Sequence, residues 1–271
     1  MKIGSREFDT INQVYMMGIL NVTPDSFSDG GRYQSLDRAL YHAQEMVEQG
    51  ADILDIGGES TRPGFQKVTV EEEIERTAPV VEAIRARFDI PISIDTYKAE
   101  VAREAIRAGA DLVNDIWGLR FDSGQMADLV AREQVCCCLM HNRDEAVYRE
   151  FVPEVLEDMR ISAGLAEKAG ILPERIILDP GIGFGKTYEQ NLVMLSHLDH
   201  LRGLGYPVLL GASRKSVIGL TLSLPADERL EGTIATTVLA VMQGCSFIRV
   251  HDVRENKRAA AMALAVRKAG M

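Results

Sequence analysis

Basic side chains occur in two glycine-containing stretches where they could bind an anion. In "GASRKSVIG", we expect Ser213 to open a helical turn that contains Arg214 and Lys215. A cation in the first turn of a helix opposes the helix dipole, so both side chains predict an anionic or electron-rich partner. In "GGESTRPG", Arg62 and the neighbouring backbone N–H groups could receive an anion. A solvated surface arginine is the alternative interpretation of Arg62.

The stretch "DPGIGFGKT" at residues 179–187 is a near miss to a nucleotide-binding loop. A P-loop needs Gly, four residues and then Gly-Lys-Ser/Thr, so that successive backbone N–H groups converge on the phosphates. Counting back from Gly185, Lys186 and Thr187 places Pro180 where the first glycine should be. Proline has no N–H and a fixed φ, so it cannot serve there. This weakens the interpretation of the chain as an ATPase.

Eight short apolar runs alternate with longer segments of helical period. The runs are "VYMMGIL", "DILDI", "PISID", "DLVND", "VCCCLM", "RIILD", "PVLLGA" and "SFIRV". Thr69 and Glu72 predict a capping box at the start of one helix. Four glycines stand where helices should end: Gly50, Gly109, Gly170 and Gly244. Strands that alternate with helices pair in parallel, so eight such units in 271 residues predict one (β/α)8 TIM barrel over residues 1–271.

In such a barrel the active site lies at the carboxyl ends of the strands, where this sequence places mainly polar residues. In chain order they are Asn21, Asp55, Asp95, Asn114, Met140, His141, Asp179, Ser213 to Lys215, and Arg249 to His251. Side chains alternate along a strand, so Asp95 shares a face with Ser93, and Arg249 shares one with His251. We therefore predict a polar ring at the mouth of the barrel.

Several of these residues also have a purely structural interpretation. Asp95 could cap the helix that follows it. Asn21 and Asp179 could fix the turns before Pro24 and Pro180. Met140 could be an ordinary core methionine.

Composition limits the possible partners and the compartment. Asp and Glu number 40 against 30 Lys and Arg, and no basic stripe is present, which argues against nucleic acid as a partner. The run "VYMMGIL" is too short to span a bilayer, and no signal peptide precedes it. We therefore expect a soluble, cytoplasmic protein.

Cysteine and histidine spacing gives little support for a structural metal site. Cys136, Cys137 and Cys138 are consecutive, and neighbours in a strand point to opposite faces, so they cannot converge on one metal. A buried strand with reduced thiols is predicted instead. His197 and His200 have a spacing that could hold a metal, but no third ligand is evident, and a solvated helix face is favoured.

Taken together, eight motifs resemble those of the dihydropteroate synthase family. They are "MGILNVTPDSFSDGG", "DILDIGGESTRPG", "SIDTYKAEVA", "NDIWG", "LMH", "LDPGIGFGK", "LLGASRKSVIG" and "IRVHDV", in that family's order over nearly the whole chain. The resemblance implies a (β/α)8 barrel enzyme of folate biosynthesis that is usually homodimeric and is the target of sulfonamides. Its reaction joins 4-aminobenzoate to (7,8-dihydropterin-6-yl)methyl diphosphate and releases diphosphate with the help of Mg2+.

The resemblance also assigns residues to each ligand. The pterin would bind deep in the barrel to Asp95, Asn114, Met140, Asp179, Lys215 and Arg249. The diphosphate would bind to Asn21, Thr61, Arg62, Arg249 and His251, with Asn21 also at the Mg2+. 4-Aminobenzoate would lie near Phe27, Thr61, Pro63, Phe184, Ser213 and Lys215. The residues expected to act in catalysis are Asp95, Lys215, Arg249 and His251.

One stretch departs from the family pattern. After "LMH" many relatives carry a Met-Gln-Gly segment, whereas this chain has "NRDEAVYREF". The contacts made by the loop after the fifth strand therefore stay open.

Two other functions on the same barrel compete with this interpretation. A pterin-binding methyltransferase that acts on a methylated folate would bind the pterin with the same three polar side chains, Asp95, Asn114 and Asp179. It would need no diphosphate site, and four basic side chains argue for one: Arg62, Lys215, Arg249 and His251. A pterin carrier without activity is the second, and a turnover assay separates it from an enzyme.

Overall fold

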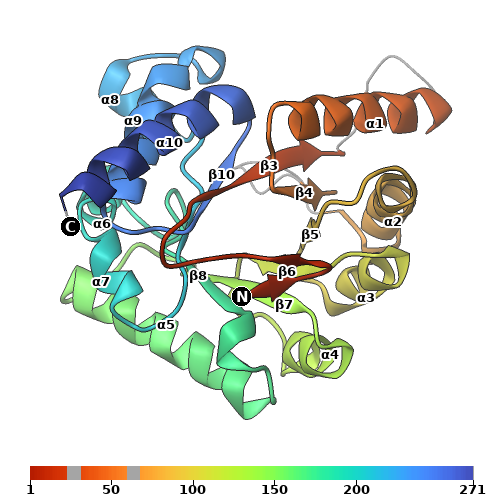
Figure 1. Cartoon of the computed structure of the whole chain (residues 1–271). Coiled ribbons are helices and arrows are strands. Elements are labelled where there is room, and N and C mark those ends of the chain that lie inside the picture. Colours follow the sequence, from red (N-terminus) through yellow and green to blue (C-terminus); the bar gives the residue numbers. More distant parts are fainter. Residues whose placement is uncertain (23–31, 60–67, 271) are drawn as a thin grey trace.

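The computed structural model describes residues 1–22, 32–59 and 68–270. Within them, eight parallel strands form a nearly closed barrel surrounded by helices (Figure 1). The strands are β3 (Tyr15–Asn21), β4 (Ile53–Gly57), β5 (Ile92–Asp95), β6 (Leu112–Asp115), β7 (Cys136–Met140), β8 (Ile176–Asp179), β9 (Leu209–Leu210) and β10 (Phe247–Val250). Each of the eight apolar runs supplies one strand, and the predicted (β/α)8 barrel is confirmed.

The strands are paired in the order β8-β7-β6-β5-β4-β3-β10-β9. The first barrel strand, β3, therefore lies between β4 and the last strand, β10, with Tyr15 opposite Phe247. A bridge from Leu178 to Val208 joins the two remaining edges at β8 and β9.

Helices cover the outside of the barrel. They are α1 (Arg32–Glu48), α2 (Val70–Arg87), α3 (Ala99–Ala108), α4 (Gln125–Glu133), α5 (Phe151–Lys168), α6 (Tyr188–Leu195), α7 (Leu198–Arg202), α8 (Ser216–Leu222), α9 (Leu230–Met242) and α10 (Val253–Ala269), with short 3-10 turns η2 (Pro173–Arg175) and η3 (Ala226–Glu228). The four glycines predicted to end helices all have positive φ, between 89° and 117°. None of the helices in the described part of the chain is long and apolar enough to cross a membrane.

The predicted capping box before α2 is half realised. The Thr69 side chain accepts a hydrogen bond from the backbone N–H of Glu72 at 3.2 Å. The Glu72 carboxylate, however, pairs with Arg76 one turn further along the helix. A guanidinium within reach therefore takes the carboxylate that the capping box would use.

Alternation along the strands separates two apolar layers. Ile92, Ile94, Ile248 and Val250 belong to the layer between strands and helices. The second layer fills the amino end of the barrel and includes Met17, Ile53, Leu112, Cys136, Cys138, Ile177, Leu209 and Phe247. Cys137 lies in the outer layer, so the three consecutive cysteines do point to opposite faces, and all are buried and free, as predicted.

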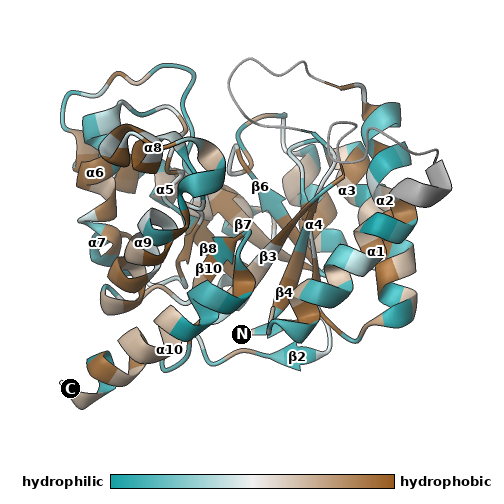
Figure 2. Ribbon diagram, turned by 90° about the horizontal axis from the view of Figure 1, so that it is seen from above, coloured by the Kyte–Doolittle hydropathy of each residue, from teal (hydrophilic) through white to brown (hydrophobic). Residues whose placement is uncertain are grey.

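An N-terminal hairpin closes the amino end of the barrel. Its strands are β1 (Lys2–Ile3) and β2 (Arg6–Glu7), which pair antiparallel. Ile3 and Phe8 are buried with the inner layer, and the ring centroid of Phe8 lies 4.7 Å from that of Tyr15. In Figure 2 the hairpin and the N-terminus lie at the lower end of the barrel, below strands that are mostly hydrophobic. Apolar packing fills this end, so the polar ring lies at the other.

Strand register aligns the polar residues of the carboxyl ends. Asn21 is paired with Gly57, Gly57 with Asp95, and Asp95 with Asn114, which forms one row across four strands. Parallel pairing places equivalent positions side by side, so the row follows directly from where each run ends.

Candidate active site

Arg249 binds two carboxylates at the mouth of the barrel. Its Nε donates to Asp55 Oδ2 and its Nη2 donates to Asp95 Oδ2, both at 2.6 Å. Asn114 Nδ2 donates to the same Asp55 oxygen at 3.3 Å. The Asp55 side chain is fully buried, and those of Asp95 and Arg249 are 12% and 16% exposed. The predicted polar ring is thus confirmed for these strands.

The alternative in which Asp95 caps a helix is wrong. Helix α3 begins at Ala99, and its N-cap residue is Lys98 rather than Asp95. The carboxylate points instead to Arg249, because the strand's alternation directs it into the barrel.

Asp179 both fixes its own turn and faces the mouth. Its Oδ1 accepts a hydrogen bond from the backbone N–H of Gly181 at 2.7 Å, so the structural interpretation of this residue is right. A methyl group on Gly211 would lie 3.5 Å from Asp179 Oδ2 and 3.7 Å from Arg249 Cδ. The second carboxylate oxygen and the arginine therefore approach the same point beside β9.

Lys215 lies over the loop that follows Asp179. Its Nζ donates to the carbonyl of Ile182 at 2.5 Å and is 4.6 Å from the centroid of the Phe184 ring. A methyl group on Gly183 would lie 3.3 Å from Lys215 Cδ, so this glycine leaves room for the lysine stem. Lys215 thus has a carbonyl and an aromatic face as neighbours, both suited to a cation.

The structure corrects the sequence interpretation of "GASRKSVIG". Helix α8 begins at Ser216 with Lys215 as its N-cap, so Ser213 does not open a helical turn. Arg214 has a φ of 58° and donates to both carboxylate oxygens of Asp252, at 2.6 and 3.1 Å. The anionic partner predicted for Arg214 therefore lies within the protein, because the left-handed residue turns this side chain towards the start of α10.

Ser213 instead contacts His251. The Ser213 Oγ accepts the backbone N–H of His251 at 3.2 Å, and its hydroxyl lies 2.9 Å from His251 Nδ1. The hydroxyl can donate to Nδ1 or accept from it, so both ring tautomers are compatible with this contact. This pair fixes the orientation of the imidazole at the end of β10.

Apolar side chains form a separate cluster at the mouth. Tyr97, Ile116 and Met140 are buried together, and Trp117 and Phe184 pack against them. Met140 and Phe184 were predicted to face two different ligands, and the structure places both in this one cluster. An apolar cluster thus lies at the same end of the barrel as the charged row.

Asn21 ends β3 and is exposed. A methyl group on Gly57 would lie 3.6 Å from Asn21 Oδ1 and 3.7 Å from Asp95 Oδ2, so these oxygens flank the same glycine. The other predicted site residues, Phe27, Thr61, Arg62 and Pro63, lie outside the described residues.

Burial favours the neutral forms of the central charged groups. It raises the pKa of Asp95 to about 7, although Arg249 acts in the opposite direction. It also raises the pKa of Asp179, and it lowers the pKa of Lys215 to about 8. For Arg249 burial works against the charge, but Asp55 and Asp95 outweigh it and raise its pKa. Perturbed groups of both signs gathered at one end of the barrel are typical of an active site.

Metal ligation by protein side chains alone is not evident in the described part of the chain, where no three His, Cys, Asp or Glu side chains form such a group. The rings of His197 and His200 contact each other edge to face, with centroids 5.0 Å apart.

Two features were missed from the sequence. Asp55 was placed at a strand end without a role, although its alternation with Leu54 and Ile56 already directs it into the barrel. His141 was likewise named without a function, and Lys186 was considered only as part of an incomplete P-loop. The structure brings His141 and Lys186 together, with Lys186 Nζ 2.8 Å from His141 Nδ1.

Comparison with known proteins identifies the family of this barrel. The model of the family described as "Pterin binding enzyme" matches residues 17–251. A dihydropteroate synthase of Clostridium beijerinckii is 57% identical over 263 residues, which cover 97% of both chains.

Two solved structures agree with that relative. The crystal structure of a Clostridium difficile dihydropteroate synthase in the presence of pteroic acid has a TM-score of 0.93 and 51% identity, over 96% of this chain and 99% of that one. A Xanthomonas albilineans dihydropteroate synthase in complex with 7,8-dihydropteroate has a TM-score of 0.86 and 43% identity, over 94% of both chains. With the polar mouth of the barrel, these matches show that the chain belongs to the dihydropteroate synthase family of pterin-binding enzymes.

Proposed function

We propose that this chain condenses 4-aminobenzoate with (7,8-dihydropterin-6-yl)methyl diphosphate at the mouth of its barrel, giving 7,8-dihydropteroate and diphosphate. One observation carries the proposal. Asp95, Asn114 and Asp179 lie at the mouth of the barrel together with two cations, Lys215 and Arg249. Carboxylates and an amide match the N–H and carbonyl groups of a pterin ring, and the cations match a charged leaving group.

Arg249 would serve two ligands at once. Its guanidinium donates from its edge to Asp55 and Asp95, so one planar face would serve the pterin. Such a face stacks on aromatic rings, and its remaining N–H groups can bind an anion. The ion pairs limit how far the guanidinium can turn, so it would be preorganised for both tasks.

In the reaction the bond between the pterin methylene carbon and the diphosphate oxygen breaks, and a bond from the same carbon to the amine nitrogen forms. The electrons of the broken bond leave with the diphosphate, and the amine loses one proton. An electron-rich dihydropterin stabilises a positive methylene carbon, so we expect cleavage to run ahead of attack by this weak nucleophile. Asp95 would then steady the developing cation.

A magnesium ion fits the oxygen donors near Gly57. Mg2+ is usually bound by one or two protein oxygens together with substrate phosphates and water. Asn21 Oδ1 is such an oxygen, next to Asp95 Oδ2. When bound, the ion would neutralise charge on the leaving diphosphate. His251, fixed by Ser213, would contact the same diphosphate.

4-Aminobenzoate would lie against the Phe184 ring, close to Lys215 and Ser213. The stem of Lys215 and the ring provide an apolar surface, and Ser213 lies two residues before the lysine. Sulfonamides share the arylamine and would occupy the same place. The predicted contribution of Phe27, Thr61 and Pro63 stays a proposal.

Incubation with the pterin diphosphate, 4-aminobenzoate and Mg2+ tests the function, with dihydropteroate detected as the product. Product formation is expected. Transfer of a methyl group from a methylated folate, without dihydropteroate formation, would instead support the methyltransferase alternative. Binding of the pterin with neither reaction would indicate a carrier.

Asn21→Ala is expected to raise the Mg2+ concentration needed for half-maximal rate by about tenfold or more, because one oxygen ligand is lost. Rates measured over a range of Mg2+ at saturating substrates check this. Asn12→Ala is the control, since Asn12 binds Asp9 near the N-terminus. An unchanged Mg2+ requirement in the Asn21 variant would remove this residue from the metal site.

The activity is expected to follow a narrow bell-shaped pH profile in kcat/KM. Pterin binding needs Asp95 ionised, so the rate rises as pH passes its pKa of about 7. It falls as pH passes the pKa of Lys215, about 8, because the cation is lost. Lys215→Arg should move the basic limb beyond pH about 10, since a guanidinium keeps its proton there. A basic limb that does not move would assign it to another group.

We further propose that the enzyme is a homodimer in the cytoplasm. Exposed apolar side chains on three neighbouring helices support an interface: Leu220 and Leu222 on α8, Leu239 and Met242 on α9, and Met262 and Val266 on α10. Four free, buried cysteines support a reducing compartment. Sedimentation at about twice the chain mass of 29.9 kDa would support the dimer.

A further inference from the structure

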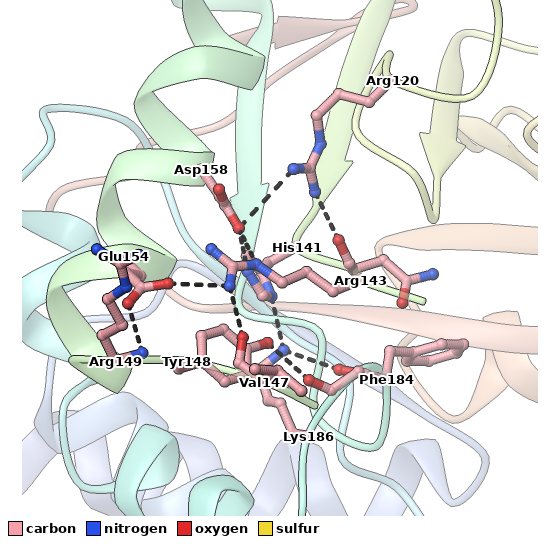
Figure 3. A network of polar contacts seen from close by, with 12 residues as sticks. Arg120, His141, Arg143, Val147, Tyr148, Arg149, Glu154, Asp158, Phe184 and Lys186 are labelled. Atoms are coloured by element: carbon pink, nitrogen blue, oxygen red, sulfur yellow. Dashed lines mark hydrogen bonds and ion pairs between the residues drawn. The ribbon is translucent and has the colours of Figure 1, made fainter. Parts of the chain in front are cut away.

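Lys186, the lysine of the P-loop-like stretch, donates only to atoms of the protein. Its Nζ lies 3.0 Å from the carbonyl oxygens of Gly181 and Phe184 and 2.8 Å from His141 Nδ1 (Figure 3). An ammonium group has three N–H donors and no acceptor. All three are therefore used, and Lys186 is not arranged to bind a phosphate.

A buried histidine holds Lys186 in this position. His141 is fully buried, and its Nε2 lies 3.0 Å from Asp158 Oδ2 on α5. Burial lowers the pKa of His141 to about 4, so the ring is neutral near pH 7. Although burial raises it, hydrogen bonds from His141 and Arg143 hold the pKa of Asp158 well below its usual range. Nε2 therefore donates to a carboxylate, and Nδ1 is left to accept from Lys186.

The loop after β7 supports the same stretch. Tyr148 donates its hydroxyl hydrogen to the carbonyl of Gly185 at 2.6 Å. A methyl group on Gly185 would lie 2.6 Å from the carbonyl oxygen of Arg143, so only glycine allows this approach. The Arg143 side chain also binds Asp158 and Glu154 and lies over the Tyr148 ring (Figure 3).

Side-chain donors thus bind four of the five carbonyls of residues 181–185. Lys186 donates to the carbonyls of Gly181 and Phe184. Tyr148 donates to that of Gly185, and Lys215 donates to that of Ile182. The backbone that carries the Phe184 ring is therefore set from one side by Lys186 and from the other by Lys215. The Asp179 carboxylate accepts from the backbone N–H of Gly181, so Lys186 acts on it only indirectly, through the Gly181 carbonyl.

We propose that Lys186, oriented by His141 and Asp158, is a positioning residue that sets the Phe184 ring for the second substrate. The proposal rests on the proposed function, in which 4-aminobenzoate lies against Phe184. It makes a selective claim: loss of Lys186 disturbs the place of 4-aminobenzoate and leaves the pterin pocket around Asp95, Asn114 and Asp179 nearly intact.

Lys186→Met is the test, with Lys257→Met as the matched control. Lys257 also donates to a carbonyl and to a carboxylate, those of Gly50 and Asp52, at the amino end of the barrel. Burial lowers the pKa of Lys186 to about 7, so rates are measured at pH about 6, where its ammonium form prevails. We expect KM for 4-aminobenzoate to rise about tenfold in Lys186→Met, with KM for the pterin diphosphate changed less than about threefold. Lys257→Met should change neither KM.

A double-mutant cycle with Phe184→Leu shows whether Lys186 acts through the ring. If it does, Lys186→Met adds much less than tenfold to KM in the Phe184→Leu background. Full additivity, an equal rise in both KM values, or an unchanged KM for 4-aminobenzoate would each overturn the proposal. Should Lys186→Met not fold, Lys186→Gln keeps two donors and is expected to show a smaller rise of the same selectivity. Failure of the unaltered enzyme to make dihydropteroate would refute the proposed function instead.

Discussion

Lys215→Met is expected to lower kcat/KM for dihydropteroate formation by about 10²–10³-fold and to leave thermal stability unchanged or higher. The loss follows from removal of a preorganised cation next to the places proposed for both substrates. The stability follows from burial, because the ammonium has a carbonyl and a ring as neighbours but no carboxylate within ion-pair distance among the described residues. Kinetics at saturating Mg2+ and melting temperatures measured in parallel test both halves.

The effect of Lys215→Met on stability should depend on pH in a defined direction. Its folded pKa of about 8 lies below the ordinary value of 10.5, so the unfolded chain binds the proton more tightly between these values. The favourable contribution of this group is present above the ordinary pKa and is lost as pH falls through about 8. Methionine does not titrate, so Lys215→Met does not lose this stability. The stability of the variant relative to the native protein should therefore be greater near pH about 6 than near pH about 10. A variant that melts well below the native protein and keeps its activity would return Lys215 to a structural role.

Arg249→Met is expected to abolish activity and also to destabilise the fold by about 3–5 kcal/mol near neutral pH. Here function and stability fall together, because the guanidinium is the shared partner of two buried carboxylates. Removing it leaves Asp55 and Asp95 near each other without a counter-charge. Urea unfolding gives the free-energy change, and the same preparations give the rate.

A second substitution shows whether the stability lost in Arg249→Met comes from unpaired buried charge or from lost packing. Asp55→Asn in the Arg249→Met background removes one of the two negative charges and should recover a substantial part of the lost stability, without recovering activity. Arg214→Met is the control, because its pair with Asp252 is more exposed, at 33% and 19%, and should cost less. No recovery in the double variant would attribute the cost to packing of the arginine stem.

The sequence predicted the barrel well because its physical signals are local. Each apolar run had a strand's length and polar residues at or next to its carboxyl end, and parallel pairing then aligned Asn21, Asp95 and Asn114 without further information. The resemblance to a known family supplied their assignment to ligands, which alternation along a strand could not supply. Positions of the loops, in contrast, depend on contacts between distant segments.

One wrong prediction and one missed contact illustrate that limit. Ser213 was expected to open a helix because a serine precedes two cations, but Arg214 adopts a left-handed conformation and delays the helix to Ser216. The partner of Arg214 is Asp252, which lies 38 positions further along the chain, beyond any local sequence pattern. The contact from Lys186 to His141 spans 45 positions and was equally inaccessible. These residues acquire their roles only when neighbouring loops meet.

The pairing of β3 with β10 has a consequence for synthesis of the chain on the ribosome. Phe8 and Tyr15 are made first, yet both pack on Phe247 near the end of the chain. The β3 edge that β10 covers is therefore exposed during nearly all of translation, as an unpaired strand that could associate with another chain. Contacts of such high sequence separation slow folding, because the intervening chain must be ordered first. The barrel can be completed only when almost the whole chain has left the ribosome.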